Sequence, residues 1–144
     1  MSALIPHRRA PIEARLNQIQ PDDYYPALSV EEWRNYYRVD DTLSAERAHT
    51  MLSNATALIQ AELDSWREQQ TTATLPERLH ISYRQAVYQR AKAHELEQYR
   101  DIDTTSAGEK HNYALELRIN TALQRSREAL HRLKGSTRIM VALV

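Results

Sequence analysis

Glycine is almost absent from this chain, and its scarcity restricts the possible folds more than any motif does. Only two of the 144 residues are glycine. Phosphate-binding loops, dinucleotide-binding turns and tight β-hairpins all use glycine where φ is positive or where the backbone approaches a ligand closely. The chain is instead rich in Ala, Leu, Gln, Glu and Arg, which favour helices. We therefore expect an all-α fold without those three kinds of site.

Apolar residues recur at spacings of three and four over most of the chain, which is the period of amphipathic helices. Ser29 and Ser106 are each followed three residues later by Glu, which marks helix starts, and Ser44 is placed as the N-cap of the helix after it. A glycine after the last apolar position marks a helix end. These patterns predict helices at about 30–38, 45–70, 76 or 81 to 100, and 106–134, with Ser29, Ser44 and Ser106 at their starts and Gly135 at the last end.

The third of these helices is the expected centre of the fold. Its many alanines would let neighbouring helices approach closely, and it ends in an acidic connection. We expect Arg90 or Arg100 to pair with Asp101 or Asp103 at this corner, so these four residues are given an architectural role.

Both ends of the chain differ from the helical middle. Residues 1–28 contain four prolines spaced too closely for a long helix. They predict an extended N-terminal arm that either lacks fixed structure or orders on a partner. Residues 136–144 are apolar and partly β-branched, and no other segment has this character. They predict a strand-like tail that either folds back on the helices or adds to a sheet of another chain.

The expected fold is thus an antiparallel bundle over residues 29–135, made of about three long helices plus one short N-terminal helix. It is flanked by the arm, 1–28, and by the tail, 136–144.

No constellation of residues points to catalysis, a metal or a cofactor. Cysteine is absent, and the six histidines are scattered without a helical metal-site spacing. The segment after Asp101 begins like a calcium loop but lacks its glycine and its final Glu. No serine lies in a nucleophile motif, and no apolar run is long enough to cross a membrane. We therefore expect a protein that is not an enzyme, needs no cofactor and does not enter membranes.

Charge is balanced overall but unevenly distributed. Lys+Arg and Asp+Glu are both 19. The charged residues within 22–46 are mainly acidic, whereas the charged residues within 118–138 are mainly basic. Either both are solvated faces, or the acidic face of one copy meets the basic face of the next in a ring. The basic residues that would face a ring neighbour or DNA are Arg118, Arg125, Arg127, Arg132 and Lys134. A helical nucleic-acid-binding module that uses this last helix is the alternative function.

Several strings, in their order and spacing, resemble the phage head-completion protein (GpL) family of temperate contractile-tailed bacteriophages. The resemblance covers roughly residues 24–144. The strings are Tyr25-Pro26, Arg38-Val39-Asp40, Thr42 to Arg47, Glu62-Leu63 with Trp66 to Gln69, Tyr83 to Ala93 leading into Tyr99 to Thr104, and Gly135-x-x-Arg138 before an apolar tail.

This resemblance implies a structural virion protein. Such proteins join the capsid after DNA packaging, dock on the portal as a ring of copies, help retain the genome and receive the tail. The resemblance implies a ring of twelve copies. The implied partners are the portal protein, neighbouring copies and a tail-terminator or neck protein, and contact with packaged DNA is left open. The implied location is the head–tail connector of the virion, with the host cytoplasm during assembly. In related adaptors the C-terminal segment reaches into the portal. The implied docking tail is therefore Arg138, Ile139, Met140, Val141, Ala142, Leu143 and Val144.

Overall fold

The computed structural model describes residues 12–100 and 106–135, and the described chain is mainly helical, as expected. Three helices are long: α3 (Ala45–Glu68), α4 (His80–Glu97) and α5 (Ser106–Lys134). Two are short, α1 (Ala14–Asn17) and α2 (Val30–Tyr36), and a single 3₁₀ turn, η1 (Glu77–Leu79), precedes α4. Strands β1 (Gln18–Ile19) and β2 (Leu28–Ser29) form a two-stranded antiparallel sheet, with Gln18 opposite Ser29 and Ile19 opposite Leu28.

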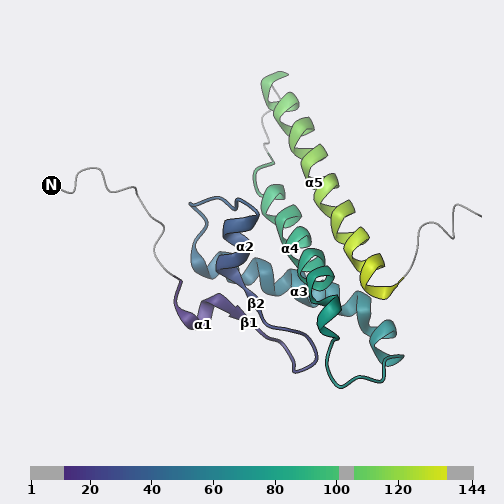
Figure 1. Cartoon of the computed structure of the whole chain (residues 1–144). Helices are drawn as coiled ribbons and strands as arrows, with labels where there is room; N and C mark the ends of the chain where they lie inside the picture. The colour runs from purple at the N-terminus through teal and green to yellow at the C-terminus, as the bar shows by residue number, and fades with distance from the viewer. Residues whose placement is uncertain (1–11, 101–105, 136–144) are drawn as a thin grey trace, which may run out of the picture.

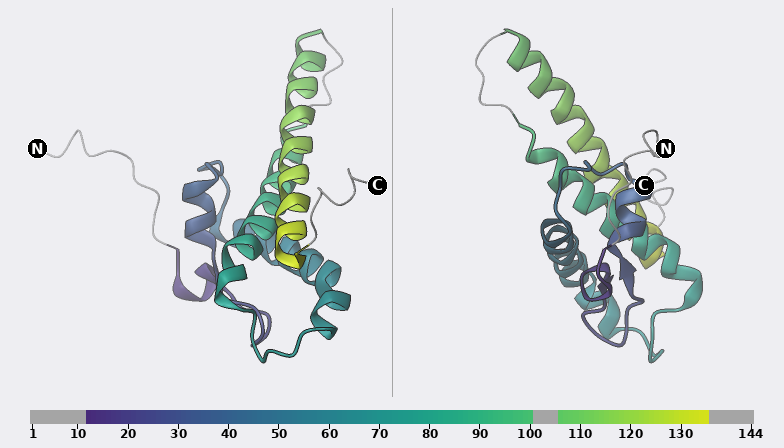
Figure 2. Two further views of the ribbon diagram at one scale, coloured as in Figure 1. Left: turned by 45° about the vertical axis from the view of Figure 1, so that its right-hand side comes forward. Right: turned by 90° about the vertical axis from the view of Figure 1, so that its left-hand side faces the viewer.

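Helix α4 lies between α3 and α5 and is the central packing element (Figures 1 and 2). Side-chain contacts give the direction of α3. Arg47, near its start, donates a hydrogen bond to Gln98 just beyond the end of α4, at 3.0 Å. Gln60, further along α3, donates to the Tyr83 hydroxyl near the start of α4, also at 3.0 Å. Helix α3 therefore runs antiparallel to α4, and α4 and α5 form a second antiparallel pair (Figure 1).

The α4–α5 contact is close because its side chains are small. Ala86 and Ala91 of α4 are fully buried. Ser126, the one polar residue in the apolar seam of α5, donates a 2.7 Å hydrogen bond to the Ala86 carbonyl oxygen. The three–four spacing that predicts an amphipathic last helix is confirmed, since the residues with this spacing on α5 are all buried: Leu115, Ile119, Ala122, Ser126, Ala129 and Leu133.

The prediction of an extended arm over residues 1–28 is wrong for residues 12–28, which pack against the helices. Leu16, Ile19, Tyr24, Tyr25 and Leu28 are buried, and the Leu75 backbone N–H donates to the Tyr24 carbonyl at 2.9 Å. The statement that only the tail has strand character is also wrong, because β1 and β2 lie in this segment. Prolines prevent a long helix here, but they do not prevent apolar residues between them from covering a helix face. Residues 1–11 lie outside the described residues.

Two aromatic contacts hold this segment in place. The Tyr25 ring stacks on Tyr83 of α4 with ring centroids 4.8 Å apart. The Arg67 guanidinium of α3 lies 4.3 Å from the centroid of the Tyr24 ring and pairs with Asp22 at 2.7 Å. Although burial opposes ionisation of Asp22, hydrogen bonds from Arg67 and from backbone N–H groups hold the pKa of that carboxyl below its usual value.

The predicted helix caps are confirmed at three positions. Ser29 and Ser44 each accept a backbone N–H at the start of α2 and α3, and Gly135 after α5 has a φ of 76°. The Ser29 backbone N–H donates to the Tyr88 hydroxyl at 3.1 Å, so long-range packing completes the cap.

Helix α2 ends two residues earlier than predicted, at Tyr36. Arg38 has a φ of 49°, the left-handed conformation that glycine usually adopts after a helix. The Val39 N–H donates to the Arg34 carbonyl, which closes the helix end. Because a side chain in this conformation costs roughly 1 kcal/mol relative to glycine, Arg38 is held there by its surroundings.

Candidate interaction site: a basic groove between α2, α4 and α5

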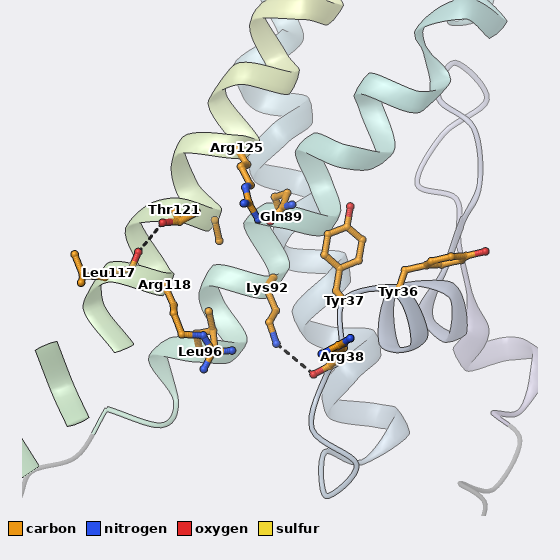
Figure 3. Close-up of a pocket in the computed structure, with 11 residues that line it drawn as sticks. Tyr36, Tyr37, Arg38, Gln89, Lys92, Leu96, Leu117, Arg118, Thr121 and Arg125 are labelled. Carbon is orange, nitrogen blue, oxygen red and sulfur yellow. Dashed lines mark hydrogen bonds between the residues drawn. The ribbon is translucent and has the colours of Figure 1, made fainter. Parts of the chain in front are cut away.

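A groove of about 450 Å³ lies where the end of α2 faces α4 and α5. It collects positively charged side chains from three parts of the chain: Arg38 after α2, Lys92 on α4, and Arg118 and Arg125 on α5 (Figure 3). None of the described residues that line it is acidic. We call this site the basic groove and define it by these four residues with Tyr36 and Tyr37.

Lys92 ties the groove to the core beneath it. Its Nζ pairs with the Glu95 carboxylate at 2.8 Å, and Glu95 is only 2% exposed. The same Nζ lies 3.4 Å from the Arg38 carbonyl oxygen, so it also fixes the left-handed turn after α2. Glu95 offsets much of the Lys92 charge, which leaves the positive charge of the groove mainly on Arg38, Arg118 and Arg125. Among the described residues, no carboxylate pairs with these three guanidinium groups.

Two tyrosines form the α2 side of the basic groove. Tyr36 is 80% exposed, which is unusual for an aromatic residue. Tyr37 is half-buried and packs edge-on against Tyr88 with ring centroids 5.6 Å apart. Burial raises the pKa of Tyr37, and the nearby Glu32 raises it further, while Arg125 across the groove opposes the change.

The structure divides the five basic residues predicted on the last helix between two flanks of α5. Arg118, Arg125 and Arg132 recur every seven residues, close to two helical turns, so they share one flank. Two of them line the basic groove, and Arg132 extends the line by donating to Gln85 of α4 at 2.9 Å. Arg127 and Lys134 are each two residues beyond a member of this line. Two residues correspond to about 200° around a helix, so both lie on the opposite flank.

The predicted corner residues are only partly within the described chain. Arg100 pairs with Glu116 of α5 at 2.6 Å, which links the end of α4 to α5. Arg90 lines a separate groove between α3 and α4, beside Asn54 and His94. Asp101 and Asp103 lie outside the described residues, so their pairing with an arginine stays a prediction. The tail residues 138–144 also lie outside them.

Sequence reasoning missed the contributions of Arg38, Lys92 and Tyr36. A glycine usually marks a left-handed turn after a helix, and the chain has none near position 38, so the sequence does not indicate the turn at Arg38. Lys92 and Tyr36 join the site only through the packing of α2 on α4, which local patterns do not encode.

The described residues contain no group of three or more potential metal ligands. Within the same residues, no helix is both long and apolar enough to span a bilayer. The described site is a basic surface groove on a helical scaffold.

Comparison with known proteins gives the family of the chain. The family model for phage head completion protein (GPL) matches residues 19–144, and the chain belongs to this family. A curated relative, the head completion/stabilization protein of Escherichia phage P2, is 22% identical over 168 aligned positions that cover 100% of this chain and 99% of the relative. No solved structure matches the chain. Membership of this family indicates a structural role in the phage head and a place in the virion.

Proposed function

We propose that this protein completes the phage head by docking on the portal as a ring of copies after DNA packaging. The ring helps to retain the genome and presents the surface to which the tail or a neck protein attaches. Membership of the head completion family supports the general role, and the charge distribution on the described helices supports assembly into a ring.

The observation that carries the ring is the separation of charge across α4. Helix α5 lies on the other side of α4 from α3 (Figure 2). Helix α3 carries exposed acidic residues, whereas the charged residues of α5 are mainly basic. The exposed acidic residues of α3 are Glu46, Glu62, Asp64 and Glu68. Of the two arginines of α3, Arg67 pairs with the Asp22 carboxylate, whereas Arg47 donates to the neutral Gln98 amide and keeps its charge near the start of the helix. A contact between the α3 face of one copy and the α5 face of the next joins two different surfaces, and such contacts close into rings when the rotation permits.

The flank of α5 that carries Arg127 and Lys134 suits this neighbour contact. It faces away from the basic groove, so a neighbouring copy could cover it without blocking the groove. The corresponding partner surface is the acidic face of α3, which shares only Glu46 with the acidic residues of 22–46 that the sequence offers for this contact.

Portal docking is assigned to the apolar tail, Arg138 to Val144. A segment of alternating side chains can add to a sheet edge through its backbone while its side chains fill adjacent pockets. Ile139, Val141 and Leu143 would share one face of such a strand.

The test compares portal binding by the full chain and by a chain that ends at Gly135. The truncated chain should keep the helical circular dichroism of the full chain, because the described core does not include the tail, and it should no longer bind portal. In the full-length protein, Ile139→Asp should weaken portal binding strongly. Ala142→Ser, which lies in the same tail and adds only a hydroxyl group, should not. Undiminished portal binding by the truncated chain would show that docking uses another surface.

A further inference from the structure

We infer that the basic groove binds the phosphate backbone of duplex DNA, with Arg118, Arg125 and Arg38 as its principal contacts and Arg132 extending the same surface. In the proposed function, packaged DNA at the portal is the source of this duplex. The binding chemistry itself rests only on the described residues.

Positive charge without a carboxylate partner in the described chain is concentrated in the basic groove. Three guanidinium groups face one groove, and none of the described residues supplies a carboxylate to them. Like charges that converge without a partner repel one another, and an anion that binds between them relieves this repulsion. The groove is therefore suited to an anionic partner.

The spacing of the charges favours a regular polyanion. Arg118, Arg125 and Arg132 lie about 10.5 Å apart along one flank of α5, so the line spans about 21 Å. One strand of duplex DNA carries a phosphate every 3.4 Å or so of helix axis, so a line of this length faces about six phosphates. An acidic peptide is the competing ligand, because Leu96, Leu117 and Ala122 also line the groove. The regular spacing of the arginines along α5 favours the evenly spaced charges of duplex DNA, and a polyglutamate probe distinguishes the two.

The walls of the basic groove also suit a phosphate backbone. Besides its cations, the groove presents the Gln89 amide (Figure 3). The Thr121 hydroxyl also lines the groove, but it donates its proton to the Leu117 carbonyl oxygen at 2.8 Å. Arginine, lysine and amide groups are usual partners of phosphate oxygens. The exposed Tyr36 ring at the rim adds an apolar surface that a deoxyribose of the backbone can contact.

Arg38 has a left-handed backbone conformation that a glycine would adopt more easily. The Lys92 ammonium group lies beside the Arg38 carbonyl oxygen. Backbone strain of this kind is typical of residues with a binding role. Here it places a cation opposite those of α5.

The overall charge distribution also orients the molecule. Because α3 carries exposed acidic residues, a DNA duplex would be repelled from that side and attracted to the side that carries the groove. The zero net charge of the chain is therefore compatible with local DNA binding.

The test is fluorescence anisotropy of the full chain with a short labelled DNA duplex at several salt concentrations. One variant combines Arg118→Gln with Arg125→Gln. The matched control combines Arg127→Gln with Lys134→Gln, which removes the same charge from the other flank of the same helix. The first variant should lose affinity on the order of tenfold and reduce the slope of log affinity against log salt by about 1.8, while the control should stay near the unmodified chain.

A second variant separates binding from folding. Arg38→Gly should weaken DNA binding while its thermal midpoint stays equal or rises, because glycine suits the left-handed position. Labelled polyglutamate serves as the alternative probe in the same assay.

Three outcomes would overturn the inference: no duplex binding by the unmodified chain at low salt, an equal loss in both double variants, or polyglutamate binding tighter than duplex binding. Portal association of the same variants, measured in parallel, distinguishes the two proposals. A chain that binds portal but not DNA would refute the groove and leave the head completion role intact.

Discussion

Tyr88→Phe tests how α2 is held on α4, and therefore how Arg38 and Tyr36 reach the basic groove. The Tyr88 hydroxyl accepts the Ser29 backbone N–H at 3.1 Å and lies 3.4 Å from the Ser29 carbonyl oxygen. Removal of this hydroxyl leaves the N–H at the start of α2 without its partner. The Trp33 indole N–H still donates to the Tyr88 backbone carbonyl, so the fold itself should survive.

The magnitude follows from the burial of the pair. A buried donor without a partner costs about 1–3 kcal/mol. Tyr88 is 3% exposed, but an open groove lined by Ser29 and Glu32 lies beside the pair, and water can reach the N–H there in part. We therefore expect a loss of about 1–2 kcal/mol in the free energy of unfolding. With a denaturant dependence of about 2 kcal/mol/M, the urea midpoint should fall by about 0.5–1 M.

The assay is urea unfolding followed by helical circular dichroism, with Tyr36→Phe as the matched control. Tyr36 is on the same helix–helix edge but is 80% exposed, so its hydroxyl should matter little. Equal midpoints for the two variants would refute the assignment of Tyr88 as the group that completes the α2 cap.

Three further predictions concern the core. Ala86→Leu should overpack the α4–α5 contact and lower the free energy of unfolding by about 1–3 kcal/mol. Ser126→Ala should lower it by only about 1 kcal/mol. Thermal melts measure both, and an Ala86→Leu variant as stable as the unmodified chain would contradict the close approach of the two helices. Lys92→Met leaves the buried Glu95 carboxylate unpaired and should cost about 3–5 kcal/mol, largely recovered when Glu95→Gln is added; no recovery would mean that Lys92 acts through packing. Burial raises the pKa of Tyr25 from 10.0 to about 12, so its contribution to stability is complete below pH 10.0 and is lost as the pH rises through about 12. The part of the tyrosinate absorbance that comes from buried tyrosines should then appear together with the loss of helix, whereas the exposed Tyr36 and Tyr113 can ionise in the intact fold. Ionisation of all tyrosines in an intact fold would contradict this burial.

The features that could be predicted from sequence are those that depend on local patterns. The seam of α5 follows from its three–four spacing, the Ser44 cap from its position before an apolar run, and the end of α5 from Gly135. Each of these depends on residues within a few turns of one another.

The features that sequence reasoning missed depend on contacts between distant residues. Ser29 and Tyr88 are 59 positions apart, and their hydrogen bond decides how α2 lies on α4. The packing of residues 12–28 depends similarly on Tyr83 and Leu75, far along the chain. The basic groove forms only when α2 is in this position, so a count of charges along the last helix could not separate Arg118 and Arg125 from Arg127.

The mass of the full-length protein, measured by native mass spectrometry alone and with the assembled portal, tests the head completion role most directly. We expect a monomer in isolation and a complex in which several copies add to each portal ring. A folded protein that adds no mass to the portal, at concentrations where the complex should form, would contradict it.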